Sequence, residues 1–340
     1  MNTRICTLPL VPILIAVATA GSSSSFANHP FLRGISVCSS TADTLWRSCL
    51  HDAYDDYYES IAICLNENDR SELGECENEV KDERREVISE CRDIREARKD
   101  LCDEIGEEAY APDFGPDFAS NFVDPRDIGV TVNPHPYLPL VNGNRWVYEG
   151  TFEDDDGEEV TETITVTVTD KIKMIDGIPC VVVKDVVEEE GELIEDTDDW
   201  FAQDIFGNVW YCGEISLNYE TFDGDDPEEA QLVDIDGSWK SGEEGAKAGI
   251  LLPAVPEVGM FIRQEVAWGE AEDVIEIVDV TGTQEAPAAS CDGNCLVTRD
   301  FTPLEPGTDE FKYYAPGVGM IAEEAPEDDE RVELIEVELH

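Results

Sequence analysis

Apolar side chains recur at steps of three and four from residue 40 to residue 106, which is the spacing of one face of an α-helix. A first arm of this pattern ends at Cys64 and a second begins at Leu73. The stretch from Asn66 to Gly74 is polar and ends in glycine, which is typical of a turn between helices. The pattern therefore predicts an antiparallel helical hairpin over residues 38–106.

Six cysteines lie in this helical region at spacings of 11, 15, 12, 15 and 11 residues, which read the same from either end. Paired from the outside inward, the two residue numbers of each pair add to 140, and the same holds for Trp46 with Ile94. Bridged cysteines need Cα atoms about 4.4–6.8 Å apart, which close antiparallel helices provide at matched heights. We therefore expect a ladder of three disulfides: Cys38–Cys102, Cys49–Cys91 and Cys64–Cys76.

After residue 106 the pattern changes twice. Residues 107–133 contain Ala-Pro, Gly-Pro and Asp-Pro steps without a period, so we expect a linker. From about residue 144, apolar and polar residues alternate with period two between turn signals, which indicates short antiparallel strands. The expected strands are 145–152, 160–169, 178–188, 192–203, 208–214, 230–239, 260–268, 273–281, 295–301, 310–315, 318–323 and 332–339.

The predicted fold class is therefore α+β in separate modules: a disulfide-laddered helical hairpin, then an all-β antiparallel domain over residues 134–340. That domain is a twisted sheet, an open barrel or a sandwich. Adjacent aromatic residues such as Trp200-Phe201 and Trp210-Tyr211 must point to opposite faces of a strand. Both faces of the sheet are thus expected to be covered, one by the core and the other by a packing element or a ligand.

The N-terminus has the pattern of a secretory signal peptide over residues 1–27. Arg4 precedes a short apolar run, and small residues suited to cleavage follow, at Ala20 or Ala27. The run is shorter than the ~20 apolar residues that span a bilayer. We therefore expect a secreted or periplasmic protein without membrane insertion.

The chain is extremely acidic, with 79 Asp and Glu against 22 Lys and Arg and a net charge of −57. Such a charge repels phosphate backbones, so nucleic acid is excluded as a partner. The charge also suits a hydrated surface adapted to high salt, where ions screen the repulsion. Calcium binding is the alternative, and its weak candidates are acidic loop residues: Asp196, Asp198, Asp223, Asp225 and Asp226.

Other catalytic chemistry has little support. The histidines His29, His51, His135 and His340 are expected at the surface, so we assign no catalytic residues. Removing Cys6 with the signal leaves ten cysteines, an even number that suits an oxidising compartment. We therefore expect Cys180, Cys212, Cys291 and Cys295 to be disulfide-bonded too, in one of three connectivities. No cofactor is indicated.

Several motifs between about residues 133 and 323 are specific in combination. They include Trp146-Val147-Tyr148-Glu149-Gly150, Asp199-Trp200-Phe201-Ala202-Gln203-Asp204, and Lys312-Tyr313-Tyr314-Ala315-Pro316-Gly317-Val318-Gly319. In these motifs the chain resembles a widespread family of uncharacterised secreted bacterial proteins. The resemblance implies export and carries no activity, and the helical hairpin lies outside it.

These observations favour a secreted, non-enzymatic protein that binds an unknown protein or small-molecule ligand. One alternative is an extracytoplasmic hydrolase that uses carboxylates. Another is a carrier of an apolar ligand inside an open β-barrel.

Overall fold

The computed structural model describes residues 36–66, 70–112, 114–153, 159–222, 224, 226–227, 229–326 and 330–340. The expected signal peptide, with His29, lies outside these residues, as do the calcium candidates Asp223 and Asp225. Residues from Ser36 to His340 belong to one compact unit.

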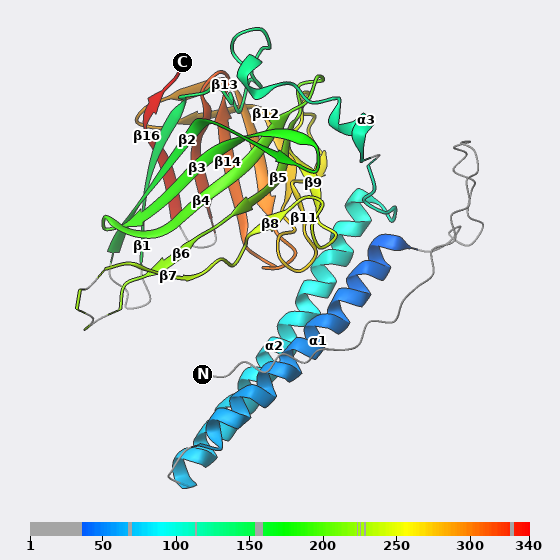
Figure 1. The fold of residues 1–340 in the computed structure, drawn as a ribbon, viewed down its shortest axis with the longest axis vertical. Helices are drawn as coiled ribbons and strands as arrows, with labels where there is room; N and C mark the ends of the chain where they lie inside the picture. Colours follow the sequence, from blue (N-terminus) through cyan, green and yellow to red (C-terminus); the bar gives the residue numbers. More distant parts are fainter. Residues whose placement is uncertain are drawn as a thin grey trace, which may run out of the picture. The chain divides into compact units, whose positions relative to one another are not determined.

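Two long helices, α1 (Val37–Cys64) and α2 (Arg70–Ile105), run antiparallel as a hairpin (Figure 1). Three disulfides join them: Cys38–Cys102, Cys49–Cys91 and Cys64–Cys76, with Cα atoms 5.7, 5.8 and 5.7 Å apart. The predicted ladder is confirmed, because residues whose numbers add to 140 do face each other across the hairpin.

Few large apolar side chains are fully buried between the helices, so the disulfides supplement a thin interface. Ala42 and Ala53 of α1 are buried together with Val80 and Leu101 of α2. Arginines of α2 also cover aromatic rings of α1, as where the Arg84 guanidinium lies 4.0 Å from the centre of the Tyr57 ring. Such small contacts bury little area, so cross-links that restrict the unfolded chain contribute much of the hairpin's stability.

The rest of the chain forms one antiparallel sheet of sixteen strands, which wraps into a nearly closed barrel (Figure 1). The strands are β1 (Arg145–Glu153), β2 (Glu159–Ile175), β3 (Ile178–Glu189), β4 (Glu192–Gln203), β5 (Val209–Ile215), β6 (Asn218–Glu220), β7 (Gln231–Asp234), β8 (Trp239–Lys240), β9 (Lys247–Leu252), β10 (Phe261–Arg263), β11 (Glu265–Val266), β12 (Val274–Glu285), β13 (Ser290–Phe301), β14 (Asp309–Ala315), β15 (Gly319–Ala325) and β16 (Glu330–Glu338). The fold class predicted from the sequence is therefore confirmed, and of its three β architectures the barrel is the one present.

The barrel closes at a bend between β10 and β11. The chain of paired strands begins at β10, runs through β12–β16 and β1–β5, and ends at β9 and β11. Only Gln264 separates the two end strands in sequence, so the edges of the sheet meet there. The closure is tight: a Cβ atom on Gly249 of β9 would lie 2.2 Å from the Gln264 carbonyl oxygen. Strand β9 was missed by the sequence pattern because its glycine and alanine residues resemble a turn.

Residues 107–133, expected to be a linker, pack closely on the outside of the barrel (Figure 1). They contain the short helix α3 (Pro116–Ala119) and the 3₁₀-helix η1 (Pro125–Asp127). Phe118 stacks edge-to-face on Trp210, with ring centres 5.1 Å apart. We call residues 110–122 the aromatic strap. The strap covers the strand face that carries Trp200 and Trp210, whereas Phe201 packs on the opposite face.

The barrel cysteines do not all pair as expected. Cys291 and Cys295 form a disulfide within β13, but Cys180 and Cys212 are buried free thiols. The prediction of a disulfide at these two positions is wrong. Cys180 lies on β3 and Cys212 on β5, with β4 between them, and two strand spacings of about 4.8 Å exceed the Cα separation that a disulfide spans. Four disulfides remain, which fit an oxidising compartment.

Candidate functional site

A cavity of about 320 Å³ opens in the barrel wall where β5, β11, β13 and β14 come together. Seven carboxylates line it: Glu214, Glu265, Glu270, Asp273, Asp300, Glu305 and Glu310. One ammonium group, Lys312, shares the cavity with them. We call this cavity with its charged lining the acidic cavity.

Lys312 of β14 is shared among three carboxylates. Its Nζ lies 3.2 Å from Glu310, 3.4 Å from Glu323 and 3.5 Å from Asp300. Burial lowers the pKa of the lysine, but these three negative charges outweigh burial and hold the pKa well above its ordinary value. Lys312 therefore stays charged and offsets part of the surrounding negative charge. It cannot neutralise all seven acids of the cavity.

A chain of hydrogen bonds joins two further acids next to the cavity. The Tyr211 hydroxyl oxygen lies 2.5 Å from Asp199 Oδ1 and 2.9 Å from Glu214 Oε2. A phenol has one proton to donate, so the second of these hydrogen bonds needs a protonated carboxyl group as its donor. The geometry thus requires Asp199 and Glu214 to hold at least one proton between them.

The pKa values of these acids agree with that requirement. Burial raises the pKa of Asp199 to about 7, and the negative charges of neighbouring carboxylates add to the shift. Burial likewise raises the pKa of Glu214 to about 8, with a further contribution from the charge of Asp199. Burial also raises the pKa of Glu265, whose Oε1 accepts a hydrogen bond of 3.1 Å from Trp239 Nε1. Near neutral pH the acidic cavity therefore holds exchangeable protons.

The acidic lining continues along the barrel interior beyond the cavity. Asp185 of β3 has a pKa raised well above its ordinary value by burial and then by the charges of Asp199 and other carboxylates. Its Oδ1 atom is buried without a hydrogen-bond partner. Burial also raises the pKa of Glu323, which contacts Lys312. Carboxylates on successive strands are thus held in one interior that lacks enough cations for them.

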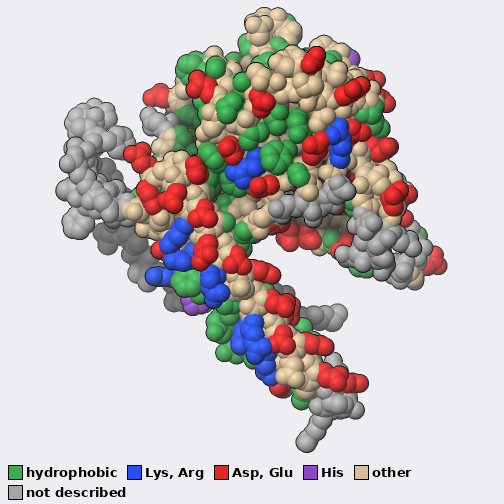
Figure 2. All heavy atoms as spheres, turned by 180° about the vertical axis from the view of Figure 1, so that it is seen from behind, with side chains coloured by type: hydrophobic (Ala, Val, Ile, Leu, Met, Phe, Trp, Pro, Cys, Tyr) green, Lys and Arg blue, Asp and Glu red, His purple; other side chains and the backbone are tan. Residues whose placement is uncertain are grey.

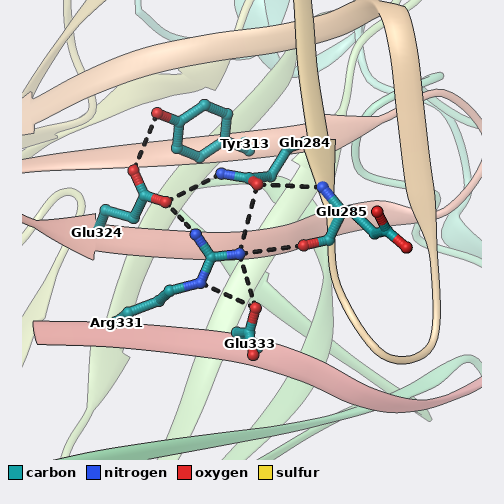
Figure 3. Close-up of polar contacts among 6 residues, drawn as sticks. All are labelled: Gln284, Glu285, Tyr313, Glu324, Arg331 and Glu333. Atoms are coloured by element: carbon teal, nitrogen blue, oxygen red, sulfur yellow. Dashed lines mark hydrogen bonds and ion pairs between the residues drawn. The ribbon is translucent and has the colours of Figure 1, made fainter.

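A second cation-centred network shows what full compensation looks like (Figure 3). Arg331 of β16 contacts Glu324 and Glu333, and donates to Gln284 Oε1 and to the Glu285 carbonyl oxygen. Tyr313 donates to the free oxygen of Glu324 at 3.1 Å. Here each charge meets an opposite charge or a hydrogen-bond partner, so the network ties β12, β14, β15 and β16 together and offers no site.

The residues proposed from the sequence as calcium ligands do not form a site. Lys184 forms ion pairs with both Asp196 and Asp198, so these carboxylates are already engaged by a cation. Within the described parts of the chain, no three His, Cys, Asp or Glu side chains are grouped so that they could hold a metal ion.

His135 is buried, which corrects the expectation that every histidine lies at the surface. It is 2 % exposed, its Nε2 lies 3.1 Å from the Pro253 carbonyl oxygen, and its Nδ1 accepts from the Tyr137 N–H at 3.2 Å. A ring that donates from Nε2 and accepts at Nδ1 is neutral, and burial lowers its pKa. Both nitrogens are engaged, so His135 fixes the entry of the chain into the barrel.

The acidic cavity was missed by sequence analysis because 53 acids in the β domain offered too many candidates. One signal was available. Asp185 and Asp199 each lie within a strand, two residues from a side chain of the buried face, Val183 and Phe201 respectively. An acid at such a position faces inward, and a charged residue seldom does so without a function or a partner.

The α-helices of the described residues include none that is long and apolar enough to cross a membrane. Comparison with protein-family models, with curated proteins and with solved structures found no match.

Proposed function

We propose that the protein is an exported, non-enzymatic binding protein that takes a small organic cation into the acidic cavity. The observation that carries this proposal is the imbalance of charge there: seven carboxylates and one ammonium group around about 320 Å³. Buried carboxylates without a partner destabilise a fold. A bound cation relieves that cost, whereas an anionic or neutral ligand does not.

The spread of the carboxylates around the wall favours an amine over a metal ion. A metal ion needs several ligands within about 2.0–2.6 Å of one point, and the acids do not converge in that way. A diamine can satisfy separated carboxylates with its two ends, and the Phe301 side chain in the lining offers apolar contact to its carbon chain. Salt adaptation alone does not explain these acids, since it requires charges in bulk water and not inside a barrel.

Export is part of the proposal. The four disulfides, the pattern of a signal peptide and the resemblance to secreted bacterial proteins support a secreted or periplasmic location.

The experiment is calorimetric titration of the protein with 1,4-diaminobutane at pH 7 in buffers of different ionisation enthalpy. We expect saturable binding with release of protons, because acids with pKa values of about 7 and 8 lose their protons when the cation arrives. The double variant Glu214→Gln/Asp273→Asn should bind at least about tenfold more weakly, a loss of about 1.4 kcal/mol.

The matched control is Glu257→Gln, which removes one exposed acid outside the cavity. Binding that is equal in the cavity variant and in this control would reduce the effect to general attraction by an acidic surface. Binding of calcium chloride with the same cavity dependence, and no binding of the diamine, would replace the amine by a metal ion.

A hydrolase is the second candidate, because Asp199 and Glu214 both contact Tyr211 and have pKa values suited to proton transfer at neutral pH. A screen of glycoside and ester substrates tests it. Turnover that disappears in Glu214→Gln would favour the enzyme over the binding protein.

A further inference from the structure

A second cavity, of about 280 Å³, lies where the base of the helical hairpin meets β9 and β10. Its wall is largely apolar, and it includes the Cys38–Cys102 disulfide. The principal apolar side chains are Val37, Ala42, Ile105, Ile250, Phe261 and Trp268. We call this the junction pocket, and it is separate from the acidic cavity in its lining.

Arg263 of β10 places a guanidinium group in this apolar wall. The residue is only 7 % exposed, and its Nη1 atom is buried without a hydrogen-bond partner. Its Nη2 atom lies 4.0 Å from the Cys38 sulfur, and its Cζ atom lies 4.9 Å from the centre of the Trp268 ring. Neither neighbour is an anion, so the charge of Arg263 lacks a direct partner.

The nearest buried acid is already used. Glu272 is fully buried and accepts two hydrogen bonds from Arg98, from Nε at 2.9 Å and from Nη2 at 2.5 Å. It also accepts from the Gly269 N–H at 2.8 Å. The Tyr110 hydroxyl donates to the Ala248 carbonyl oxygen at 2.7 Å and stays neutral.

The buried groups of the junction pocket therefore comprise two guanidinium groups and one carboxylate. Glu108 also lines the pocket but is exposed, so water screens its charge. A net positive charge is thus buried in a protein whose overall charge is −57. A buried cationic N–H without an acceptor is costly, and an anion that reached it would remove that cost.

Figure 2 shows the surrounding contrast on one face of the molecule: red acidic side chains are spread over the barrel, while the blue basic ones gather mainly on the hairpin. An exposed arginine in such a surface would pair with one of many acids. Arg263 does not, because its burial keeps the surface acids away.

We propose that the junction pocket binds a small organic carboxylate with an apolar body. The carboxylate accepts from Arg263 Nη1, and the body lies against the apolar wall beside Trp268. Arginine suits this role because its planar guanidinium donates to carboxylates with fixed geometry. The volume is near the lower end of the ~300–1,000 Å³ of ligand pockets, so a short fatty acid fits better than a full-length lipid.

The test is calorimetric titration of the full disulfide-bonded protein with octanoate, and with octanol and acetate as matched probes. We expect octanoate to bind with one-to-one stoichiometry. Octanol lacks the charge and acetate lacks the apolar body, so each should bind at least tenfold more weakly. Octanol binding as tightly as octanoate would overturn the proposal, and so would acetate binding as tightly or an absence of octanoate binding.

Two variants localise the effect. Arg263→Met removes the charge at similar length and should weaken octanoate binding at least tenfold, whereas Arg126→Met, an exposed arginine outside the pocket, should leave it unchanged. Should Arg263→Met fail to fold, as judged by circular dichroism, Ala42→Leu fills the pocket while keeping the arginine and should also prevent binding. Undiminished binding in the folded pocket variant would contradict the proposal. Neither variant touches the acidic cavity, so failure here leaves the diamine result to be judged separately.

Discussion

At the scale of single residues, the protein separates acids that face water from acids that face its interior. Asp199 and Glu265 are 8 % and 6 % exposed, and each is held by a hydrogen bond from an aromatic side chain, Tyr211 or Trp239. A hydrogen-bonded acid can be kept inside a barrel at moderate cost as long as it holds a proton. Protonation is therefore part of how this interior stays folded.

This leads to a prediction on pH and stability. Asp and Glu of the unfolded chain lose their protons near pH 4, whereas folded Asp199 and Glu214 keep theirs until about pH 7 and 8. Between these values the folded state binds more protons, so the free energy of unfolding falls as the pH rises. We expect the ligand-free protein to lose roughly 1–3 kcal/mol more between pH 5 and pH 8 than Asp199→Asn/Glu214→Gln does.

Urea unfolding at several pH values measures this difference. Glu257→Gln again serves as control, because its slope should match that of the unaltered protein. A double variant with the same slope as the control would show that these two acids do not carry the pH dependence.

At the scale of elements, the aromatic strap is the main addition to what the sequence suggested. The strap stacks Phe114, Phe118 and Phe122 in succession, with ring centres 4.8 and 5.1 Å apart. It covers the outer face of β3, β4 and β5, where Trp200 and Trp210 lie. A proline-containing stretch without a period can thus be an integral part of the barrel.

The strap prediction concerns Phe118, which is partly buried. Phe118→Ala should destabilise the protein by about 2 kcal/mol, somewhat less than the loss of a fully buried phenylalanine, because it leaves a gap over Trp210. Water reaching that indole should shift tryptophan fluorescence to longer wavelength. Urea unfolding and emission spectra measure both effects, and Asp117→Ala, an exposed neighbour on α3, is the control. An unchanged spectrum in Phe118→Ala would show that the strap does not protect Trp210.

At the scale of the whole molecule, a charge of −57 sets the conditions under which the fold is stable. Like charges repel across the surface, and dissolved ions screen that repulsion beyond about 10 Å at 0.1 M salt. The disulfide ladder and the buried Arg98–Glu272 pair do not depend on such screening. Salt should therefore act mainly on the acidic barrel surface.

We expect the melting temperature to rise as sodium chloride is added from low concentration. If the acids serve only as a solvated surface, calcium chloride at the same ionic strength should give a similar rise. Thermal unfolding in the two salts makes the comparison. A larger rise in dilute calcium would indicate a specific site, and a fall in both salts would contradict the repulsion argument.

The sequence by itself determined the features that depend on local spacing. The symmetry of six cysteines specified the ladder, since two helices with one turn allow a single register. Period-two alternation located most strands, because adjacent side chains of a strand must point to opposite faces.

Only the tertiary structure decided which charges lie inside. Alternation shows that Asp185 and Asp199 share a face, but barrel closure at Gln264 decides that Glu214, Asp273 and Lys312 line one cavity. The packing of the hairpin base likewise buries Arg263 away from any acid, and no spacing along the chain predicts that. Burial is a property of the assembled molecule, and burial is what turns a common charged side chain into a candidate site.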